Sequence, residues 1–242
     1  MEQVAVVIPL YQSTLNPQEE ISLRQCLHVL GSHPILFVAP ESLNLSFLNS
    51  FGITPKVIRF KAEYFKSTKT YNKLLTSELF YQAFSNFEYI LIYQLDAYVF
   101  ADNLLEWCSK GYDYIGAPKL RKLHLSNRTS CRAVLFNGGL SLRRVKPLLR
   151  YIKIYRFFFK EWLANEDAMF SFAQKRVIPF RFLLKLPHWR VALSFAFEQN
   201  PEISYKILGT LPFGCHAWER YNPTFWEQFI PKPKALSDQY LT

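Results

Sequence analysis

One short apolar run constrains the fold of this chain more than any other stretch. Residues 89–95 (YILIYQL) are almost wholly apolar and rich in Ile and Tyr, which predicts a strand covered on both faces, as in the middle of a parallel sheet. The run ends on a carboxylate, Asp96. Ligands of open α/β sheets bind beyond the carboxyl ends of the strands, so Asp96 is expected where a cofactor or metal would be held. The alternative is an aspartate that caps a following turn or helix.

Three earlier apolar runs predict further buried strands, at residues 4–9, 35–38 and 56–60. Segments with helical spacing lie between them, and the connections are short. Such an alternation is typical of an α/β fold, a Rossmann-like, doubly wound and mostly parallel sheet with helices on both faces.

Two of the intervening helices have recognisable ends. Residues 19–30 carry apolar side chains at helical spacing and stop at Gly31. Ser67 or Thr70 is expected to cap a second helix that continues to Phe84. The inner face of that helix is predicted to comprise Leu74, Leu75, Leu79 and Ala83.

The strand and helix rhythm breaks after Asp96. Residues 112–118 predict a short edge strand, and residues 119–132 are polar, basic and unpatterned, which predicts a mobile loop near the site. A chain of 242 residues fits one large domain. We expect this domain over residues 1–230, with a tail at 231–242.

Composition limits the partners. The formal charge of +10 predicts an acidic partner, which nucleic acid, an anionic membrane or a phosphate-bearing substrate would each provide. The basic residues are dispersed and no nucleic-acid-binding motif appears, so such a module is the less favoured alternative. The four cysteines are scattered without a CxxC pair, and no apolar run is long enough for a membrane span or a signal peptide. These features predict a cytoplasmic protein with reduced thiols.

Four short motifs carry a resemblance to known proteins. The strings YQLDAYVF, NGGLSLR, NEDAMF and PFGCHAW occur in this order. They resemble a bacterial family known only as a domain of unknown function, usually found among surface-polysaccharide genes. Their order and spacing are also similar to the glycosyltransferase A fold, and the resemblance covers residues 4–226. It implies a nucleotide-sugar half at about 1–118 and an acceptor half at about 119–230.

The resemblance implies an enzyme. The expected reaction is inverting transfer of a hexose from a nucleotide diphosphate sugar, most simply a uridine diphosphate hexose. The expected acceptor is a saccharide or lipid-linked saccharide in the synthesis of lipopolysaccharide, O-antigen or capsule. The alternative within the same fold is a non-catalytic nucleotide-sugar-binding or scaffold protein.

A divalent cation is part of this expectation. Asp96 matches the first aspartate of the DxD motif that holds Mn²⁺ or Mg²⁺ against a diphosphate. Tyr98 stands where the second aspartate would be, and a protonated phenol is a poor metal ligand. This substitution favours the alternative of a non-catalytic binding or scaffold protein. His216 matches a late histidine that completes the metal shell, and its alternative role is a ring packed beneath Trp218.

The acidic pair Glu166 and Asp167 matches the acceptor side of the family. A carboxylate at a helix start is able to act as general base for the acceptor hydroxyl, and Asp167 is the preferred candidate. The alternative is a favourable charge at a helix N-terminus, which suits Glu166 better. Beside them, an Asn-Gly-Gly motif would let donor sugar or acceptor lie against bare backbone, unless it is an ordinary tight turn; its residues are Asn137, Gly138 and Gly139.

The resemblance also predicts donor-binding residues in the first half. Pro9 and Tyr11 follow the first strand, where Tyr11 would stack on the nucleotide base. Gln94 precedes Asp96 in its motif. Lys73, on a predicted helix, would reach a phosphate, although a solvated basic face is the simpler explanation.

Residues 142–162 mix basic and large apolar side chains. Such a segment is able to lie on an anionic bilayer, where lipid-linked acceptors are found. The alternative is a core helix whose Lys and Arg side chains extend to solvent.

Overall fold

The computed structural model describes residues 2–120, 135–160, 162, 164–173 and 182–232. The loop predicted at 119–132 lies outside the described residues, apart from Lys119 and Leu120. The tail predicted at 231–242 is described only for Pro231 and Lys232.

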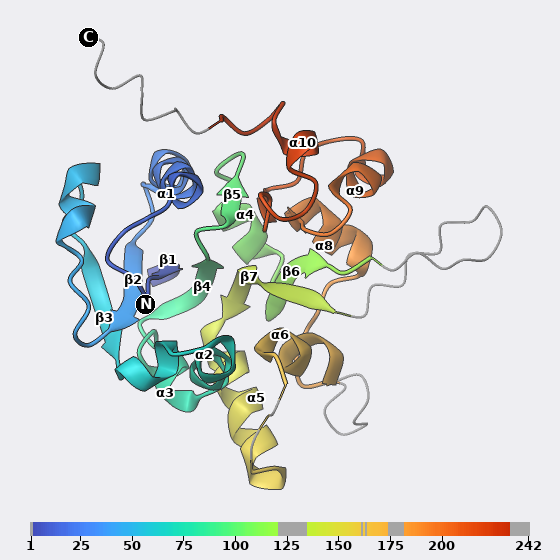
Figure 1. The fold of residues 1–242 in the computed structure, drawn as a ribbon. Coiled ribbons are helices and arrows are strands. Elements are labelled where there is room, and N and C mark those ends of the chain that lie inside the picture. Colours follow the sequence, from blue (N-terminus) through green and yellow to red (C-terminus); the bar gives the residue numbers. More distant parts are fainter. Residues whose placement is uncertain (1, 121–134, 161, 163, 174–181, 233–242) are drawn as a thin grey trace.

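A six-stranded sheet forms the centre of the molecule, in the order β3-β2-β1-β4-β7-β6 (Figure 1). The first four strands are parallel, and β7 runs antiparallel to both of its neighbours. The mixed α/β class with a mostly parallel sheet is therefore confirmed. The strands are β1 (Glu2–Pro9), β2 (Ile35–Pro40), β3 (Lys56–Phe60), β4 (Phe87–Tyr93), β6 (Tyr114–Pro118) and β7 (Phe136–Arg144).

The predicted central strand is β4, which pairs with β1 on one side and β7 on the other. Its residues from Tyr89 to Tyr93 are all buried, as a strand covered on both faces must be. The predicted edge strand is β6, at the end of the sheet. The apolar runs thus located the four parallel strands correctly, whereas β7, between β4 and β6, was not among them.

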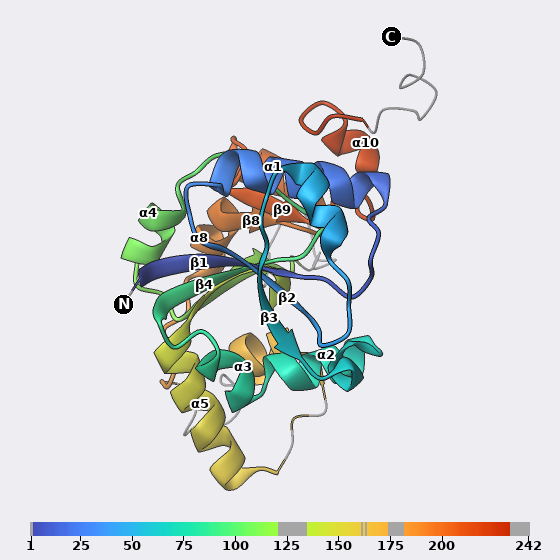
Figure 2. The same cartoon turned by 90° about the vertical axis from the view of Figure 1, so that its left-hand side faces the viewer.

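Helices cover both faces of this sheet (Figure 2). In that view α1 lies above the sheet, whereas α2, α3 and α5 lie below it. The helices are α1 (Pro17–Leu30), α2 (Thr68–Leu75), α3 (Glu78–Gln82), α4 (Leu104–Ser109), α5 (Val145–Phe158), α6 (Glu166–Ala168), α8 (Trp189–Phe195), α9 (Pro201–Leu208) and α10 (Pro223–Trp226). Short 3₁₀ turns occupy Ser46–Phe51 and Ala62–Phe65, and a π-helical turn occupies Met169–Ala173.

Helix α1 begins two residues before its predicted start at Glu19. Asn16 accepts a hydrogen bond from the backbone N–H of Glu19, and the Glu19 carboxylate accepts one from the backbone N–H of Asn16, both at 2.8 Å. This reciprocal cap satisfies two backbone donors that the helix itself leaves unpaired. Pro17 fits the first helical position because it has no N–H to satisfy.

The helix predicted from Ser67 to Phe84 is in fact two helices. Ser67 caps α2 as expected, but a second cap follows, in which Ser77 accepts from the backbone N–H of Phe80. The new start changes the helical phase, so that Leu79 is 51% exposed and Ala83 is exposed as well. The predicted inner face was therefore wrong for Leu79 and Ala83 and right for Leu74 and Leu75; beyond the break the buried residues are Phe80, Tyr81 and Phe84.

A second, small sheet joins the two halves of the chain. It consists of β5 (Ala97–Val99), β9 (Gly214–His216) and β8 (Ala196–Phe197), in the order β5-β9-β8. Strand β5 runs antiparallel to β9, and β8 runs parallel to β9. This pairing brings β9 beside β5, which begins directly after Asp96, although the two strands are more than a hundred positions apart in the sequence.

The N-terminal part of α5 belongs to the core. Val145, Leu148, Tyr151 and Ile152 are buried. Within the described ranges, no helix combines the length and the apolar character that crossing a bilayer would require.

Candidate active site

A pocket lies at the topological switch point of the main sheet, where successive strands are added on opposite sides. After β1 the next strand of this sheet is β2, which lies on one side, and after β4 the next is β6, which lies on the other side, so the switch point falls between the neighbouring strands β1 and β4. In open α/β sheets this is where ligands bind. The pocket, of about 640 Å³, is called the switch-point pocket below. It is lined by Pro9, Leu10, Tyr11, Gln12, Leu15, Asn16, Glu19, Phe65, Lys66, Ser67, Thr68, Tyr71, Gln94, Leu95, Asp96 and Glu219.

Four predicted donor-side residues meet in this pocket: Pro9, Tyr11, Gln94 and Asp96. Tyr11 is 62% exposed, so its ring is accessible to a planar partner. The predicted Lys73 is not among the lining residues and instead borders a separate cavity, whereas Lys66 lines the pocket.

His216 reaches Asp96 because of the small sheet. Ala97 pairs with His216 across β5 and β9, so Asp96, one residue earlier, lies beside the histidine. The distance from Asp96 Oδ1 to His216 Nε2 is 3.0 Å. The two residues that the motifs predicted as partners are therefore brought together.

A third residue, Glu198, completes this cluster and is absent from the predicted set. It follows β8 directly, and its Oε1 lies 3.3 Å from His216 Nδ1. The imidazole thus has one carboxylate at each ring nitrogen. A sequence signal for Glu198 exists, because it ends a mostly apolar run (residues 191–197) as Asp96 ends the run at β4.

The ionisation of this cluster follows from its contacts. Burial alone would lower the pKa of His216, but the hydrogen bond and charge of Asp96, followed by those of Glu198, raise it to about 10. Burial alone would raise the pKa of Asp96, but the hydrogen bond and charge of His216 hold it below its ordinary value. In this arrangement His216 is an imidazolium between two carboxylates.

The Asn-Gly-Gly motif packs against the same cluster. Asn137 donates from Nδ2 to Glu198 Oε1 at 2.8 Å and accepts at Oδ1 from the backbone N–H of Gly139 at 2.7 Å. A Cβ on Gly139 would lie 1.9 Å from His216 Nε2, and one on Gly138 would lie 2.1 Å from Glu166 Oε1. The close approach that the glycines allow is made by the protein's own side chains, and contact with a substrate at these residues stays a prediction.

The two residues of the acidic pair, Glu166 and Asp167, lie in different environments. Glu166 is buried and forms an ion pair of 2.5 Å with the guanidinium of Arg143, which is itself fully buried. Burial and the negative charge of Glu166 raise the pKa of Asp167 to about 7, with a smaller contribution from Glu198 and an opposing one from Arg143. A carboxyl that titrates near neutral pH is suited to accept a proton during a reaction.

A divalent cation at Asp96 would need several oxygen or nitrogen donors that converge on one point. Within the described ranges, no cluster of three or more His, Cys, Asp or Glu side chains is placed to hold a metal ion. An amide supplies the third donor instead, since Asp96 Oδ1 and Gln94 Oε1 lie 3.0 and 3.2 Å from His216 Nε2. Both separations are hydrogen-bond distances to the imidazolium, and they also match the roughly 3 Å between neighbouring ligands of an octahedral shell. His216 Nε2 would become a ligand only after losing its proton.

Tyr98 contributes nothing to such a shell. It is buried, and its ring packs against Phe100 with 5.3 Å between the centroids. The position of the second aspartate in DxD therefore belongs to the core of the small sheet.

A family model described as "Protein of unknown function (DUF5672)" matches residues 54–216. Among curated proteins, none matches the sequence. The matched region contains Asp96, the Asn-Gly-Gly motif, the acidic pair and His216.

Several solved glycosyltransferase structures have a similar fold. The galactosyltransferase LgtC, in complex with donor and acceptor sugar analogues, aligns over 88% of this chain and 86% of its own, at 12% identity and a TM-score of 0.52. Mouse xyloside xylosyltransferase 1 aligns over 88% of this chain and 97% of its own, at 12% identity and a TM-score of 0.53. GlyE of Streptococcus pneumoniae aligns over 95% of this chain at 13% identity and a TM-score of 0.50, and this chain spans 57% of its length. These similarities show a shared fold of the glycosyltransferase A type.

The contact between Gly139 and His216 yields a prediction about stability. Gly139→Ala should displace the imidazole from Asp96 and cost about 1–3 kcal/mol in the free energy of unfolding. In a His216→Ala background the ring is gone, so the same substitution should cost much less. Urea unfolding of the wild type, both single variants and the double variant measures this coupling. If the losses in the free energy of unfolding of the two single variants simply add in the double variant, Gly139 and His216 do not interact.

Proposed function

The chain belongs to the family described as a protein of unknown function, DUF5672, and we propose that it is a glycosyltransferase. The proposed reaction moves a hexose from a nucleotide diphosphate sugar to a saccharide or lipid-linked saccharide, with inversion at the anomeric carbon. One observation carries the proposal. Asp96 lines the switch-point pocket and contacts His216, which in turn contacts Glu198, and the charge of Glu198 contributes to the raised pKa of Asp167, which is about 7.

The donor is proposed to occupy the switch-point pocket. Tyr11 would stack on the base, with Pro9 shaping the wall beside it and Gln94 and Asp96 at the diphosphate. Asp96, Gln94 and His216 would hold a divalent cation, Mn²⁺ or Mg²⁺, whose charge would offset that of the departing diphosphate.

Asp167 is proposed as the general base. It takes the proton of the acceptor hydroxyl as that oxygen bonds to the anomeric carbon, and the diphosphate leaves from the opposite face with the electrons of the broken bond. Glu166 acts indirectly, because its carboxylate is engaged by Arg143 and so positions the segment that carries Asp167. Asn137, Gly138 and Gly139 would keep His216 and Glu198 in place beside the sugar.

The proposed pathway rests on the motif resemblance. The motif resemblance to a family found among surface-polysaccharide genes supports a role in lipopolysaccharide, O-antigen or capsule synthesis in the bacterial cytoplasm. The second candidate is a non-catalytic nucleotide-sugar-binding or scaffold protein, which the buried Tyr98 at the second DxD position favours.

A panel of nucleotide sugars tests the reaction. The protein is incubated with uridine, guanosine and thymidine diphosphate sugars, with and without a lipid-pyrophosphate oligosaccharide. Release of nucleoside diphosphate from at least one donor, and its loss in Asp96→Asn, is the expected outcome. Donor binding without release or transfer would support the binding protein, and the absence of both would leave only the scaffold.

The proposed cation gives a second prediction. A chelator should abolish turnover, and Mn²⁺ should restore it, because the diphosphate would otherwise leave without a neutralising charge. His216→Ala should raise the Mn²⁺ concentration needed for half-maximal activity. Full activity in chelator would mean that the Gln94, Asp96 and His216 cluster works without a metal.

The general base gives a third prediction. Asp167→Asn keeps the size of the side chain but cannot take the proton, so turnover should fall about 10²–10⁴-fold while donor affinity stays near that of the wild type. Wild-type turnover should rise as pH increases through about 7, because the base must be ionised. The groups that surround it and set this pKa are Glu166, Glu198 and Arg143.

Stability provides the control for this variant. A carboxyl whose pKa is raised on folding destabilises the fold as pH rises from its ordinary value of 3.8 toward about 7. Asp167→Asn should therefore be at least as stable as the wild type at pH 8.

Asp102→Asn, which changes an aspartate bonded to His33 at the surface, is the matched variant and should retain activity. Normal turnover in Asp167→Asn, or retention of the donor's anomeric configuration, would contradict the assignment.

We also propose that the C-terminal end of α5 contacts an anionic membrane. This end extends beyond the rest of the described molecule in both views (Figures 1 and 2). Phe157 is 84% exposed and Phe158 is 63% exposed. The exposed basic residues around them are Lys153, Arg156 and Lys160, and α5 contains no acidic residue. Apolar rings among cations match the chemistry of an anionic bilayer surface.

The contact is narrower than the predicted region 142–162. Arg143 belongs to the buried ion pair and the first two turns of α5 to the core, so the core alternative holds for this part. Only the last turn and the residues after it are left for a bilayer.

Liposome flotation tests this contact. The protein should float with vesicles rich in phosphatidylglycerol and not with neutral ones, and Phe157→Ser/Phe158→Ser should lose this binding. The control Leu105→Ser/Ile207→Ser removes exposed apolar side chains from α4 and α9 and should bind as the wild type does. Negligible binding of the wild type to both vesicles would contradict the proposal.

A further inference from the structure

A cavity of about 290 Å³ lies between α2 and the C-terminal end of α5, and it is called the α2–α5 cavity below. Its walls include Lys73 of α2 and both Tyr155 and Arg156 of α5. The two helices cover the same face of the main sheet (Figure 2). No described residue lines both this cavity and the switch-point pocket, so a ligand in it would be held apart from the nucleotide.

Helix α2 separates the two spaces. Thr68 and Tyr71, three positions apart, border the switch-point pocket. Lys73 and Thr76, also three positions apart, border the α2–α5 cavity. Residues at this spacing share one side of a helix, whereas the two positions from Tyr71 to Lys73 correspond to more than half a turn. Lys73 is therefore on the side of α2 that faces away from the proposed donor site.

The α2–α5 cavity lies beside the segment that carries the proposed base. Met169, two positions after Asp167, belongs to its lining. Trp162 also lines the cavity and donates from Nε1 to the backbone carbonyl of Asn165 at 2.8 Å. Asn72 of α2 donates to the side chain of Asn165 at 3.1 Å. These two hydrogen bonds hold the turn before Asp167 next to the cavity.

The opposite side of the cavity meets the proposed membrane contact. Tyr155 and Arg156 line the cavity and directly precede Phe157 and Phe158, whose rings are exposed. A ligand in the cavity would thus lie between the bilayer surface and the hydroxyl group that Asp167 is proposed to deprotonate.

The lining of this cavity is positively charged. Among its described residues, Lys73 and Arg156 are cations and none is acidic. The hydroxyls of Thr76 and Ser77 donate to backbone carbonyls of α2, at 2.9 and 2.6 Å. The two cations therefore determine the sign of the charge that a ligand should carry, and they approach it from two different helices.

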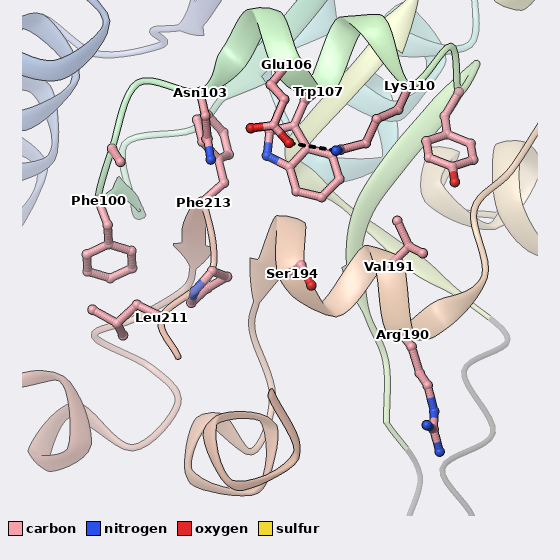
Figure 3. A pocket seen from close by; sticks show the side chains of 13 residues that line it. Phe100, Asn103, Glu106, Trp107, Lys110, Arg190, Val191, Ser194, Leu211 and Phe213 are labelled. Atoms are coloured by element: carbon pink, nitrogen blue, oxygen red, sulfur yellow. Dashed lines mark hydrogen bonds and ion pairs between the residues drawn. The ribbon is translucent and has the colours of Figure 1, made fainter. Parts of the chain in front are cut away.

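A larger cavity, of about 800 Å³ between α4 and α8, does not offer two cations to one ligand (Figure 3). Its Lys110 is paired with Glu106 across 2.7 Å. The guanidinium of its Arg190 lies over the ring of Trp189, and Figure 3 shows this side chain directed away from Trp107. An anionic ligand is therefore better matched to the α2–α5 cavity.

A diphosphate diester fits the α2–α5 cavity in charge and in surroundings. It carries two negative charges, an arginine is able to bind phosphate oxygens in a bidentate manner, and a lysine adds a point charge. The rings of Tyr155 and Trp162, edge to face with 5.8 Å between their centroids, provide apolar surface beside the cations.

We propose that the α2–α5 cavity binds the diphosphate that links the acceptor saccharide to its lipid. The lipid would enter the bilayer at Phe157 and Phe158, and the saccharide would extend toward Asp167. The phosphate expected at Lys73 is then that of the acceptor and not that of the donor. This inference rests on the proposed function, for which it narrows the acceptor to saccharides linked to a lipid through a diphosphate.

Inorganic pyrophosphate is the first probe, added without a divalent cation so that the proposed metal site does not retain it. The chain has five tryptophans, and Trp162→Phe identifies the indole signal of Trp162 in ¹⁵N-labelled protein. Pyrophosphate should move this signal in a saturable manner. Lys73→Gln/Arg156→Gln should weaken its binding about ten-fold or more, because charge-assisted hydrogen bonds are lost.

The matched control is Lys69→Gln/Arg150→Gln. It removes the same two charges from exposed positions of α2 and α5 that do not line the cavity, and it should bind pyrophosphate as the wild type does. Dihexanoyl phosphatidylglycerol, a soluble phospholipid with a single phosphate, should bind about ten-fold more weakly than pyrophosphate. The proposal is overturned if pyrophosphate leaves the Trp162 signal in place, if the two double variants bind it equally, or if the phospholipid binds as tightly.

Transfer provides the second readout. A saccharide diphosphate with a short isoprenyl chain is compared with the methyl glycoside of the same saccharide. The wild type should have a KM about ten-fold lower for the diphosphate, and Lys73→Gln/Arg156→Gln should lose this advantage with little change in kcat. Equal KM values in the wild type would overturn the proposed role in acceptor binding. Saturable binding of pyrophosphate without transfer from any donor would contradict the proposed function and leave the anion site, so the two failures are distinguishable.

Discussion

The antiparallel pairing of β5 with β9 is the constraint on which the candidate site depends. Because Asp96 directly precedes β5, the register of Ala97 opposite His216 places a carboxylate and an imidazole 3.0 Å apart although they are 120 positions apart in the chain. A slip of one residue would turn His216 to the other face of the sheet. Strand β8 adds Glu198 by the same means, so three polar side chains meet at one edge of a sheet whose interior is apolar.

A buried arginine organises the other side of the site. Arg143 is inaccessible to solvent and donates to Ser141, Gly138, Tyr81 and Glu166. A guanidinium removed from water is tolerated only with partners of this kind, and removing one of two buried charges typically costs about 3–5 kcal/mol. The ion pair therefore holds both Gly138 and the turn before Asp167, and the charge of Glu166 beside Asp167 raises the pKa of its neighbour. Glu166 is thus held in the ion pair with Arg143, and its charge is one reason why the pKa of Asp167 is raised to about 7.

Some of this organisation is readable from the sequence, and the reasons for the rest are physical. The four parallel strands of the main sheet follow from apolar runs of four to seven residues, and the cap at Ser67 follows from its side-chain chemistry. The small sheet does not, because strands of two or three residues are too short to show a period. Arg143 is a basic residue among apolar ones, for which solvent exposure is the ordinary expectation, and its burial depends on Glu166, 23 positions away. The second cap at Ser77 shifts the helical phase, which is why Leu79 and Ala83 face outward.

The most direct measurement is a crystal structure of the protein with uridine diphosphate and Mn²⁺. We expect density for the nucleotide in the switch-point pocket, with the base against Tyr11 and the diphosphate beside Asp96 and His216. Asp96→Asn should lose this density under the same conditions. Nucleotide bound elsewhere, or a switch-point pocket that stays empty at saturating uridine diphosphate and equally at saturating guanosine and thymidine diphosphates, would contradict the claim that the end of β4 is a nucleotide-sugar site.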